Sequence, residues 1–153
     1  MVRVIAGVDP GLHGAVAFYF PEKPNAVLTF DMPICGGEVN DLALNRIVER
    51  FAPDTVWLER VHSMPKNSAS SMFKFGCSYS SVRCVFAINQ VRIEFVTPPV
   101  WKKYFRLGKD KDESRKLATS KFPASADQFE LKKHEGRAEA ALIALYGLQQ
   151  GKH

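Results

Sequence analysis

Residues 2–20, VRVIAGVDPGLHGAVAFYF, constrain the fold of this chain more than any other stretch. Two apolar runs, rich in β-branched and aromatic residues, flank the turn DPGLHG at 9–14. This pattern predicts a strand, a tight reversal and an antiparallel partner strand. Asp9 then ends a buried strand, where an ionised carboxylate is costly without a cation or hydrogen-bond donors. Taken alone, however, Asp9 is better explained as a turn-forming residue.

The residues that follow predict a third strand and then alternating helices and strands. A polar turn precedes the apolar run at 26–31, so the first three strands should form an antiparallel meander. After a loop at 32–39, helices are expected at 41–51, from Ser70 or Ser71 to about 89, and at 98–104, 112–121 and 135–149, and strands at 55–59 and 92–96. This order predicts an α/β fold, with a mixed five-stranded sheet of three meander strands and two parallel strands, and helices on both faces.

Length and composition favour one domain without a membrane segment. The chain has 153 residues, of which 46% are hydrophobic, so we expect residues 1–153 to form a single domain with its own core. No apolar run reaches the length of a membrane span and the first residues lack a signal-peptide pattern, which predicts a cytoplasmic protein. Cys35, Cys77 and Cys84 form no C-x-x-C pair, so they predict neither a disulfide framework nor a zinc site.

A second carboxylate ends another predicted strand. Glu59 closes the run TVWLE, and the functional crevice of an open α/β sheet lies beyond its strand ends. If the first and fourth strands are parallel neighbours, Asp9 and Glu59 project into the same crevice. A salt bridge to Arg60 explains Glu59 equally well when that residue is taken alone.

The last predicted helix adds two further acids. Glu135 and Glu139 are four residues apart and therefore share one helix face. Leu142, Ile143 and Tyr146 continue that face, whereas Arg137, Ala140 and Ala144 are expected on the opposite side. The helix dipole favours acids at this end of the helix, but it does not explain why they lie on the apolar face.

Converging carboxylates of this kind predict a site for divalent cations. Three or four of them would raise one another's pKa values unless a cation lay between them. Their oxygen atoms suit a hard ion, Mg²⁺ or Mn²⁺, and no cysteine or histidine cluster competes. Two such ions about 3.5 to 4 Å apart suit in-line displacement at phosphate, one preparing the attacking water and the other stabilising the leaving oxygen. The predicted reaction is phosphodiester hydrolysis.

Four blocks of sequence span nearly the whole chain: GVDPGLHGAVAF, TVWLERVHSMPKNSASSMFKFG, VTPPVWKK and HEGRAEAALIALYG. Together, in this order and spacing, they resemble the RuvC family of Holliday-junction resolvases, most of all its phage and prophage branch. The resemblance implies an RNase H-like fold, a homodimer, and metal-dependent cutting of two strands of a four-way DNA junction during recombination and repair. It also implies the cytoplasm of a bacterium or a phage-infected host, and metal-ligand roles for Asp9, Glu59 and Glu139.

One position departs from the family pattern. Bacterial members carry D-x-x-D where this chain has Gly136 three residues before Glu139. Glu135 is our candidate for the missing ligand, which makes the expected catalytic and metal-binding set Asp9, Glu59, Glu135 and Glu139. His134 is a weaker substitute, because a capping or surface role explains it better. If neither reaches the ions, the site would hold one ion firmly and a second only with substrate bound.

Clusters of basic residues indicate DNA contacts. The net charge of +5 is modest, so the prediction depends on local clusters, which bind phosphates with release of counterions. The expected DNA-binding residues are Lys66, Lys74, Lys102, Lys103, Arg106, Lys109 and Lys111. His62 lies where the family places an aromatic side chain against a junction base. For any single lysine, a solvated charged loop is an equally good explanation.

Symmetric cutting of two strands favours a homodimer, because a two-fold axis relates two active sites. The helix after Ser70 is the candidate interface, although its apolar side chains would serve equally to pack on the sheet. Phe73 and Phe75 cannot share a helix face, so we expect one in the core and one exposed.

Two other functions stay open at this point. The missing D-x-x-D suggests a junction-binding module without cleavage activity. A nucleotide-binding half-domain of the actin-like type also opens with a D-x-G turn, but it needs a second such domain and ranks last.

Overall fold

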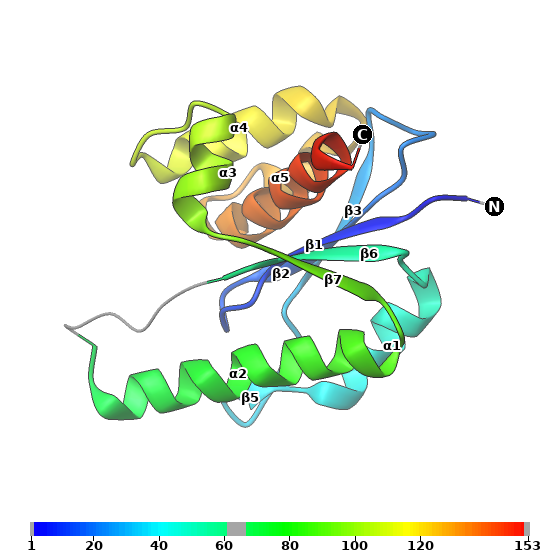
Figure 1. Cartoon of the computed structure of the whole chain (residues 1–153). Helices are drawn as coiled ribbons and strands as arrows, with labels where there is room; N and C mark the ends of the chain where they lie inside the picture. Colours follow the sequence, from blue (N-terminus) through cyan, green and yellow to red (C-terminus); the bar gives the residue numbers. More distant parts are fainter. Residues whose placement is uncertain (1, 61–66, 152–153) are drawn as a thin grey trace.

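The computed structural model describes residues 2–60 and 67–151 and has three layers, with helices on both faces of a central sheet (Figure 1). The strands of this sheet are β1 (Ile5–Asp9), β2 (Ala15–Tyr19), β3 (Val27–Asp31), β6 (Thr55–Glu59) and β7 (Arg92–Val96). The helices are α1 (Asp41–Phe51), α2 (Ala69–Ile88), α3 (Pro98–Tyr104), α4 (Lys111–Lys121) and α5 (Glu135–Gln150). Helices α3, α4 and α5 cover one face, and α1 and α2 cover the other (Figure 1).

The sheet has the predicted mixed topology. Its strand order is β3-β2-β1-β6-β7, in which β1, β2 and β3 pair antiparallel and β6 pairs parallel with both β1 and β7. In the register of β1 and β6, Gly7 lies opposite Trp57 and Val8 opposite Leu58. The two strands therefore end side by side, so the condition under which Asp9 and Glu59 share one crevice is met.

The alternation of side chains along these strands decides which face each acid occupies. In β1, Ile5 belongs to the core under α5, whereas Ala6 and Val8 belong to the core under α1 and α2. Because successive strand residues point to opposite faces, Asp9 shares the α5 face with Ile5. The same alternation in β6 places Glu59 on this face, since Leu58 belongs to the opposite core.

Helix α5 packs closely against β1. A Cβ atom on Gly7 would overlap the backbone of Ala140 and Ala144, so glycine permits the close approach. The expectation that Ala140 and Ala144 lie opposite the apolar face is wrong, because both are fully buried. The sheet covers one side of α5 while α3 and α4 pack on it as well, so most of the helix is buried all round.

Some element boundaries differ from the prediction. The expected loop at 32–39 contains a small hairpin, β4 (Ile34–Cys35) and β5 (Glu38–Val39), joined by two glycines with positive φ angles. Helix α2 begins after Ser68 rather than at Ser70 or Ser71, because the Ser68 hydroxyl accepts a hydrogen bond from the Ser71 backbone N–H at 3.1 Å. Among the described residues, no helix combines the length and apolarity that crossing a membrane requires.

Candidate active site

Three acidic side chains from distant parts of the sequence meet at the ends of β1 and β6. Carboxylate oxygens of Asp9, Glu59 and Glu139 all lie within 4.8 Å of one another. Oxygen ligands on opposite sides of a magnesium ion are about 4.2 Å apart, so small side-chain rotations would let the three groups share one cation. The donor set, three carboxylates without nitrogen or sulfur, suits Mg²⁺ or Mn²⁺.

Besides the other two acids, each acid contacts one group outside the cluster, and this group differs for each of them. Asp9 accepts a hydrogen bond from the Gly11 backbone N–H at 3.3 Å, within the turn that follows β1. Glu59 is buried and accepts a 2.7 Å hydrogen bond from the indole Nε1 of Trp101 in α3. Glu139 Oε1 lies 3.5 Å from the Lys102 ammonium. The turn, α3 and α5 thus all contribute to the position of the cluster.

Burial and mutual repulsion raise the pKa values of all three acids. Burial, followed by the charge of Glu59, raises the pKa of Asp9 to about 6. Burial also raises the pKa of Glu59 to about 7, although the hydrogen bond from Trp101 opposes this rise. Burial and the charge of Asp9 raise the pKa of Glu139 to about 7. Near neutral pH the cluster therefore holds protons that a divalent cation would displace.

Glu135 lies one turn before Glu139 and is not among the three mutually close carboxylates. Its Oε2 atom is 3.7 Å from the Lys111 ammonium. After larger causes, the charge of Glu135 still contributes to the raised pKa values of Asp9 and Glu139. Its charge therefore acts on the cluster, and its role as a fourth ligand stays a prediction.

His134 is buried, and its Nδ1 atom accepts a hydrogen bond from the Leu131 backbone N–H at 3.1 Å. It is not part of the three-carboxylate cluster. Of the two alternatives to a metal role, a surface position is wrong, because the residue is buried. The side chain caps the short 3-10 helix at 132–134 and makes no capping hydrogen bond to α5.

The structure also explains why no acid occupies position 136. A Cβ atom on Gly136 would lie 2.5 Å from the His13 carbonyl oxygen and 2.9 Å from the Gly14 Cα. These are backbone atoms of the turn that follows Asp9, so they cannot move without displacing that acid. The close contact between α5 and the turn thus excludes the first acid of a D-x-x-D pattern here.

A groove of about 490 Å³ opens beside the cluster. Asp9, Glu135 and Glu139 line it together with the basic side chains of Lys111, Lys132 and Lys133. Sequence reasoning missed Lys132 and Lys133, although two adjacent lysines immediately before HEGR were a readable signal. Acids beside a row of lysines suit a phosphate chain that approaches a metal centre.

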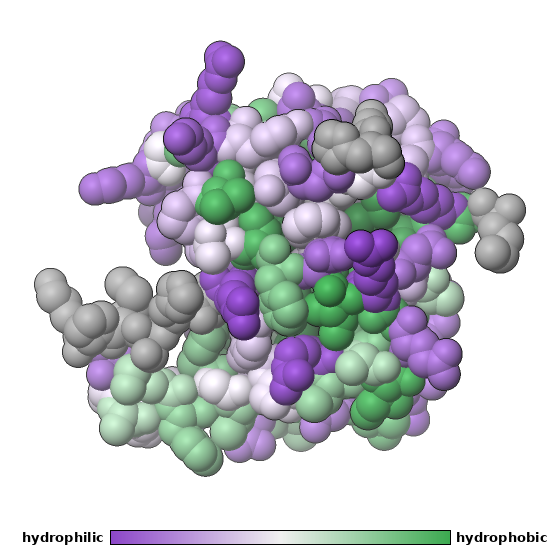
Figure 2. All heavy atoms as spheres, viewed as in Figure 1, coloured by the Kyte–Doolittle hydropathy of each residue, from purple (hydrophilic) through white to green (hydrophobic). Residues whose placement is uncertain are grey.

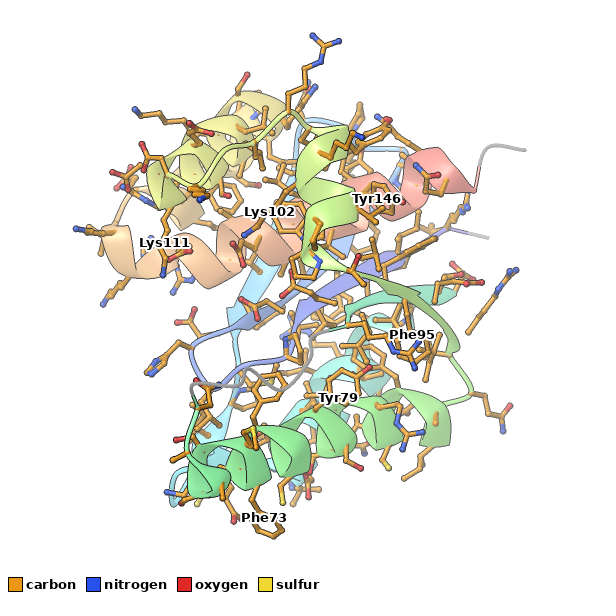
Figure 3. The ribbon with its side chains drawn as sticks, turned by 60° about the vertical axis from the view of Figure 1, so that its left-hand side comes forward. Phe73, Tyr79, Phe95, Lys102, Lys111 and Tyr146 are labelled. Atoms are coloured by element: carbon orange, nitrogen blue, oxygen red, sulfur yellow. The ribbon has the colours of Figure 1, made fainter. Side chains whose placement is uncertain are left out.

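The other predicted DNA-binding residues divide into three groups. Lys102 and Lys111 lie beside α5 in ion pairs with Glu139 and Glu135 (Figure 3). Four residues are exposed and do not line the groove: Lys74, Lys103, Arg106 and Lys109. Lys66 and His62 lie outside the described residues.

Of the two phenylalanines of α2, one is exposed as expected, but the other does not join the core. Phe73 is 74% exposed and points away from the body of the protein (Figure 3). Phe75 is half-buried, and its ring stacks with Tyr79 at a centroid distance of 6.4 Å. Phe73 therefore faces solvent, whereas Phe75 packs on a neighbouring ring of the same helix at the edge of the core.

Comparisons with known proteins identify the fold. No protein-family model matches the sequence, and no curated protein matches it. Among solved structures, T. thermophilus RuvC in complex with a Holliday junction substrate superposes with a TM-score of 0.70 at 14% identity, covering 97% of this chain and 96% of RuvC. Another Thermus thermophilus RuvC structure gives 0.67 at 15% identity, with 97% of both chains covered.

The fowlpox virus Holliday junction resolvase also matches, with a TM-score of 0.56 at 17% identity, covering 97% of this chain and 99% of the viral protein. These similarities extend over nearly the full length of every chain compared. The mixed five-stranded sheet and its flanking helices therefore have the RuvC-type, RNase H-like fold that the four sequence blocks resemble.

Proposed function

We propose that this chain is a structure-selective DNA endonuclease that resolves Holliday junctions by metal-dependent hydrolysis, with residues 1–153 forming one nuclease domain. The observation that carries the proposal is the meeting of Asp9, Glu59 and Glu139 within 4.8 Å on a RuvC-type fold. A T. thermophilus protein of this fold is described in complex with a Holliday junction substrate, which supports branched DNA as the ligand.

The residues present fit a divalent metal centre. Asp9 and Glu59 stand on the ends of adjacent parallel strands, so the sheet holds their relative position. Glu139 approaches from α5, and Glu135 is the candidate fourth ligand. Mg²⁺ or Mn²⁺ bound by these oxygens would supply an activated water and stabilise the leaving oxygen of the phosphodiester.

The chain's own cations would hold the DNA. Lys111, Lys132 and Lys133 line the groove, so a phosphate chain lying there would meet all three ammonium groups. Lys102 and Lys111 also pair with the acids and reduce their repulsion in the metal-free protein. We expect the affinity for DNA to fall steeply with salt concentration, because each phosphate contact releases counterions.

We further propose that the protein works as a homodimer with α2 at the interface. Phe73 and Ile88 of this helix are 74% and 76% exposed, more than any other large apolar side chain of the described residues. In Figure 2 the surface over α2 is largely green or pale, whereas purple side chains gather over α3 and α4. An apolar helix on one side and a charged groove on another suit a dimer that presents two sites to one junction.

Incubation of the protein with a labelled four-way junction and Mg²⁺ tests the proposal. We expect paired, symmetric nicks, and the Asp9→Asn and Glu139→Gln variants should bind the junction but cut it at least about 100-fold more slowly. Glu49→Gln, an exposed position on α1, is the matched control and should cut at the wild-type rate. Wild-type cutting by Asp9→Asn or Glu139→Gln would contradict the assignment.

A junction-binding module without cleavage is the second candidate, and the exclusion of an acid at Gly136 is the observation that favours it. A gel shift without nicks, in Mg²⁺ and in Mn²⁺, would support this module and reject the nuclease.

A further inference from the structure

Two consecutive residues of α3 contact two of the three clustered acids. Trp101 is fully buried, and its Nε1 atom lies 2.7 Å from Glu59 Oε2. The next residue, Lys102, places its ammonium 3.5 Å from Glu139 Oε1 and 5.5 Å from the centre of the Trp101 ring. Helix α3 thus reaches the cluster through one buried neutral donor and one half-exposed cation.

The contact from Trp101 has the properties of an orienting bond. An indole N–H can only donate, and a short buried hydrogen bond to a carboxylate is among the stronger ones in proteins. Because Trp101 packs within the core under α5, its ring cannot rotate without disturbing that core. The bond occupies one oxygen of Glu59, and no hydrogen bond from a described residue reaches the other.

We propose that Trp101 is a positioning residue of the metal centre, whose indole N–H fixes the Glu59 carboxylate in the orientation that a divalent cation requires. The inference rests on the proposed function, because it presumes that the cluster binds metal. Groups that orient metal ligands commonly change metal affinity by about 10- to 100-fold when they are removed. Trp101→Phe retains an aromatic ring in the core and removes only the donor and part of the ring volume.

The alternative is that Trp101 serves packing alone. In that case Trp101→Phe would lower the melting temperature without a specific effect on metal binding. Trp57→Phe provides the matched control, because Trp57 lies on the same face of β6 and packs edge-on against Tyr146 at 5.5 Å. Trp57→Phe thus replaces tryptophan by phenylalanine at a position that is not part of the acid cluster.

Calorimetric titration of the full-length proteins with Mn²⁺ measures the effect directly. We expect Trp101→Phe to bind Mn²⁺ about 10- to 100-fold more weakly than wild type, and Trp57→Phe to bind it as wild type does. In junction cleavage, Trp101→Phe should lower kcat at limiting Mn²⁺ without changing KM for DNA, and excess Mn²⁺ should restore part of the rate. Affinity for Mn²⁺ within threefold of wild type, or equal weakening by Trp57→Phe, would overturn the inference.

A fluorescence measurement keeps the inference testable if Trp101→Phe does not fold. The chain contains two tryptophans, so Trp57→Phe leaves Trp101 as the single reporter. We expect saturable Mg²⁺ binding to change its emission, and the added Glu59→Gln substitution to abolish the change. Calorimetric binding of Mg²⁺ without any change in emission would overturn the inference. If the wild-type protein binds neither ion, the proposed function itself fails and this inference fails with it.

Discussion

Replacing Glu139 with glutamine should stabilise the metal-free protein at pH 8 and change its stability little at pH 5. Burial and the charge of Asp9 raise the pKa of Glu139 from 4.5 to about 7. Below pH 4.5 the carboxyl group is protonated in both the folded and the unfolded protein, so it carries no penalty. Between pH 4.5 and about 7 the unfolded protein has lost the proton that the folded protein still holds, so stability falls with rising pH, and above about 7 the whole loss is present.

The magnitude follows from the two pKa values. A change from 4.5 to about 7 corresponds to about 3 kcal/mol of unfolding free energy at pH 8, and to about 1 kcal/mol or less at pH 5. For a domain of this size each kcal/mol shifts the melting temperature by about 2–4 °C, so the expected gain at pH 8 is about 6–12 °C. Glutamine gives this gain because it has nearly the same shape as glutamate and no charge.

Thermal unfolding followed by circular dichroism in EDTA, at pH 5 and pH 8, is the assay. Glu49→Gln, on the exposed side of α1, is the control and should change neither melting temperature by more than about 1 °C. Addition of Mg²⁺ at pH 8 should stabilise the wild type more than the Glu139→Gln variant. If Glu139→Gln raised the melting temperature equally at both pH values, or lowered it at pH 8, the electrostatic reasoning would be refuted.

Three further predictions concern the turn after Asp9, the lysines of the groove and the pH dependence of metal binding. Gly136→Ala should lower the free energy of urea unfolding by about 1–3 kcal/mol, because its Cβ would meet the His13 carbonyl at 2.5 Å. The control is Gly76→Ala on α2, where a Cβ meets nothing within 4 Å, and this variant should be stabilised. A gain in stability from Gly136→Ala would contradict the packing described. Joint substitution of Lys132 and Lys133 by alanine should reduce the salt dependence of junction binding, the slope of log K against log salt, by up to about 2. Alanine at both Lys116 and Lys121, which do not line the groove, should leave that slope unchanged. Equal slopes for the two double variants would contradict binding of DNA in the groove. Calorimetry should show Mn²⁺ affinity falling at least about tenfold from pH 8 to pH 6, because Glu59 and Glu139, with pKa values of about 7, take up protons; a constant affinity would contradict this competition.

The convergence of Asp9 and Glu59 could be predicted because it depends on local patterns. Each residue ends a short apolar run, and strand alternation fixes its face once the two strands are parallel neighbours. The face of α5 that carries Glu139 followed from helical spacing. These features repeat every two to four residues and are visible without tertiary information.

Features that depend on contacts distant in the sequence were not predictable in the same way. The burial of Ala140 requires knowledge of the glycine at position 7, since only that pairing lets α5 approach the sheet. Trp101 is 42 positions from Glu59, and no local pattern links an indole to a carboxylate so far away. Lys132 likewise reaches the groove beside Asp9 only through the fold, because the two residues are far apart in the sequence.

The most direct test of the metal site is an anomalous difference map from a crystal of the protein grown with Mn²⁺. We expect a peak within coordination distance, about 2.2 Å, of oxygens from Asp9, Glu59 and Glu139. Strong density elsewhere with none between these three carboxylates, at a Mn²⁺ concentration that supports junction cleavage, would contradict the account.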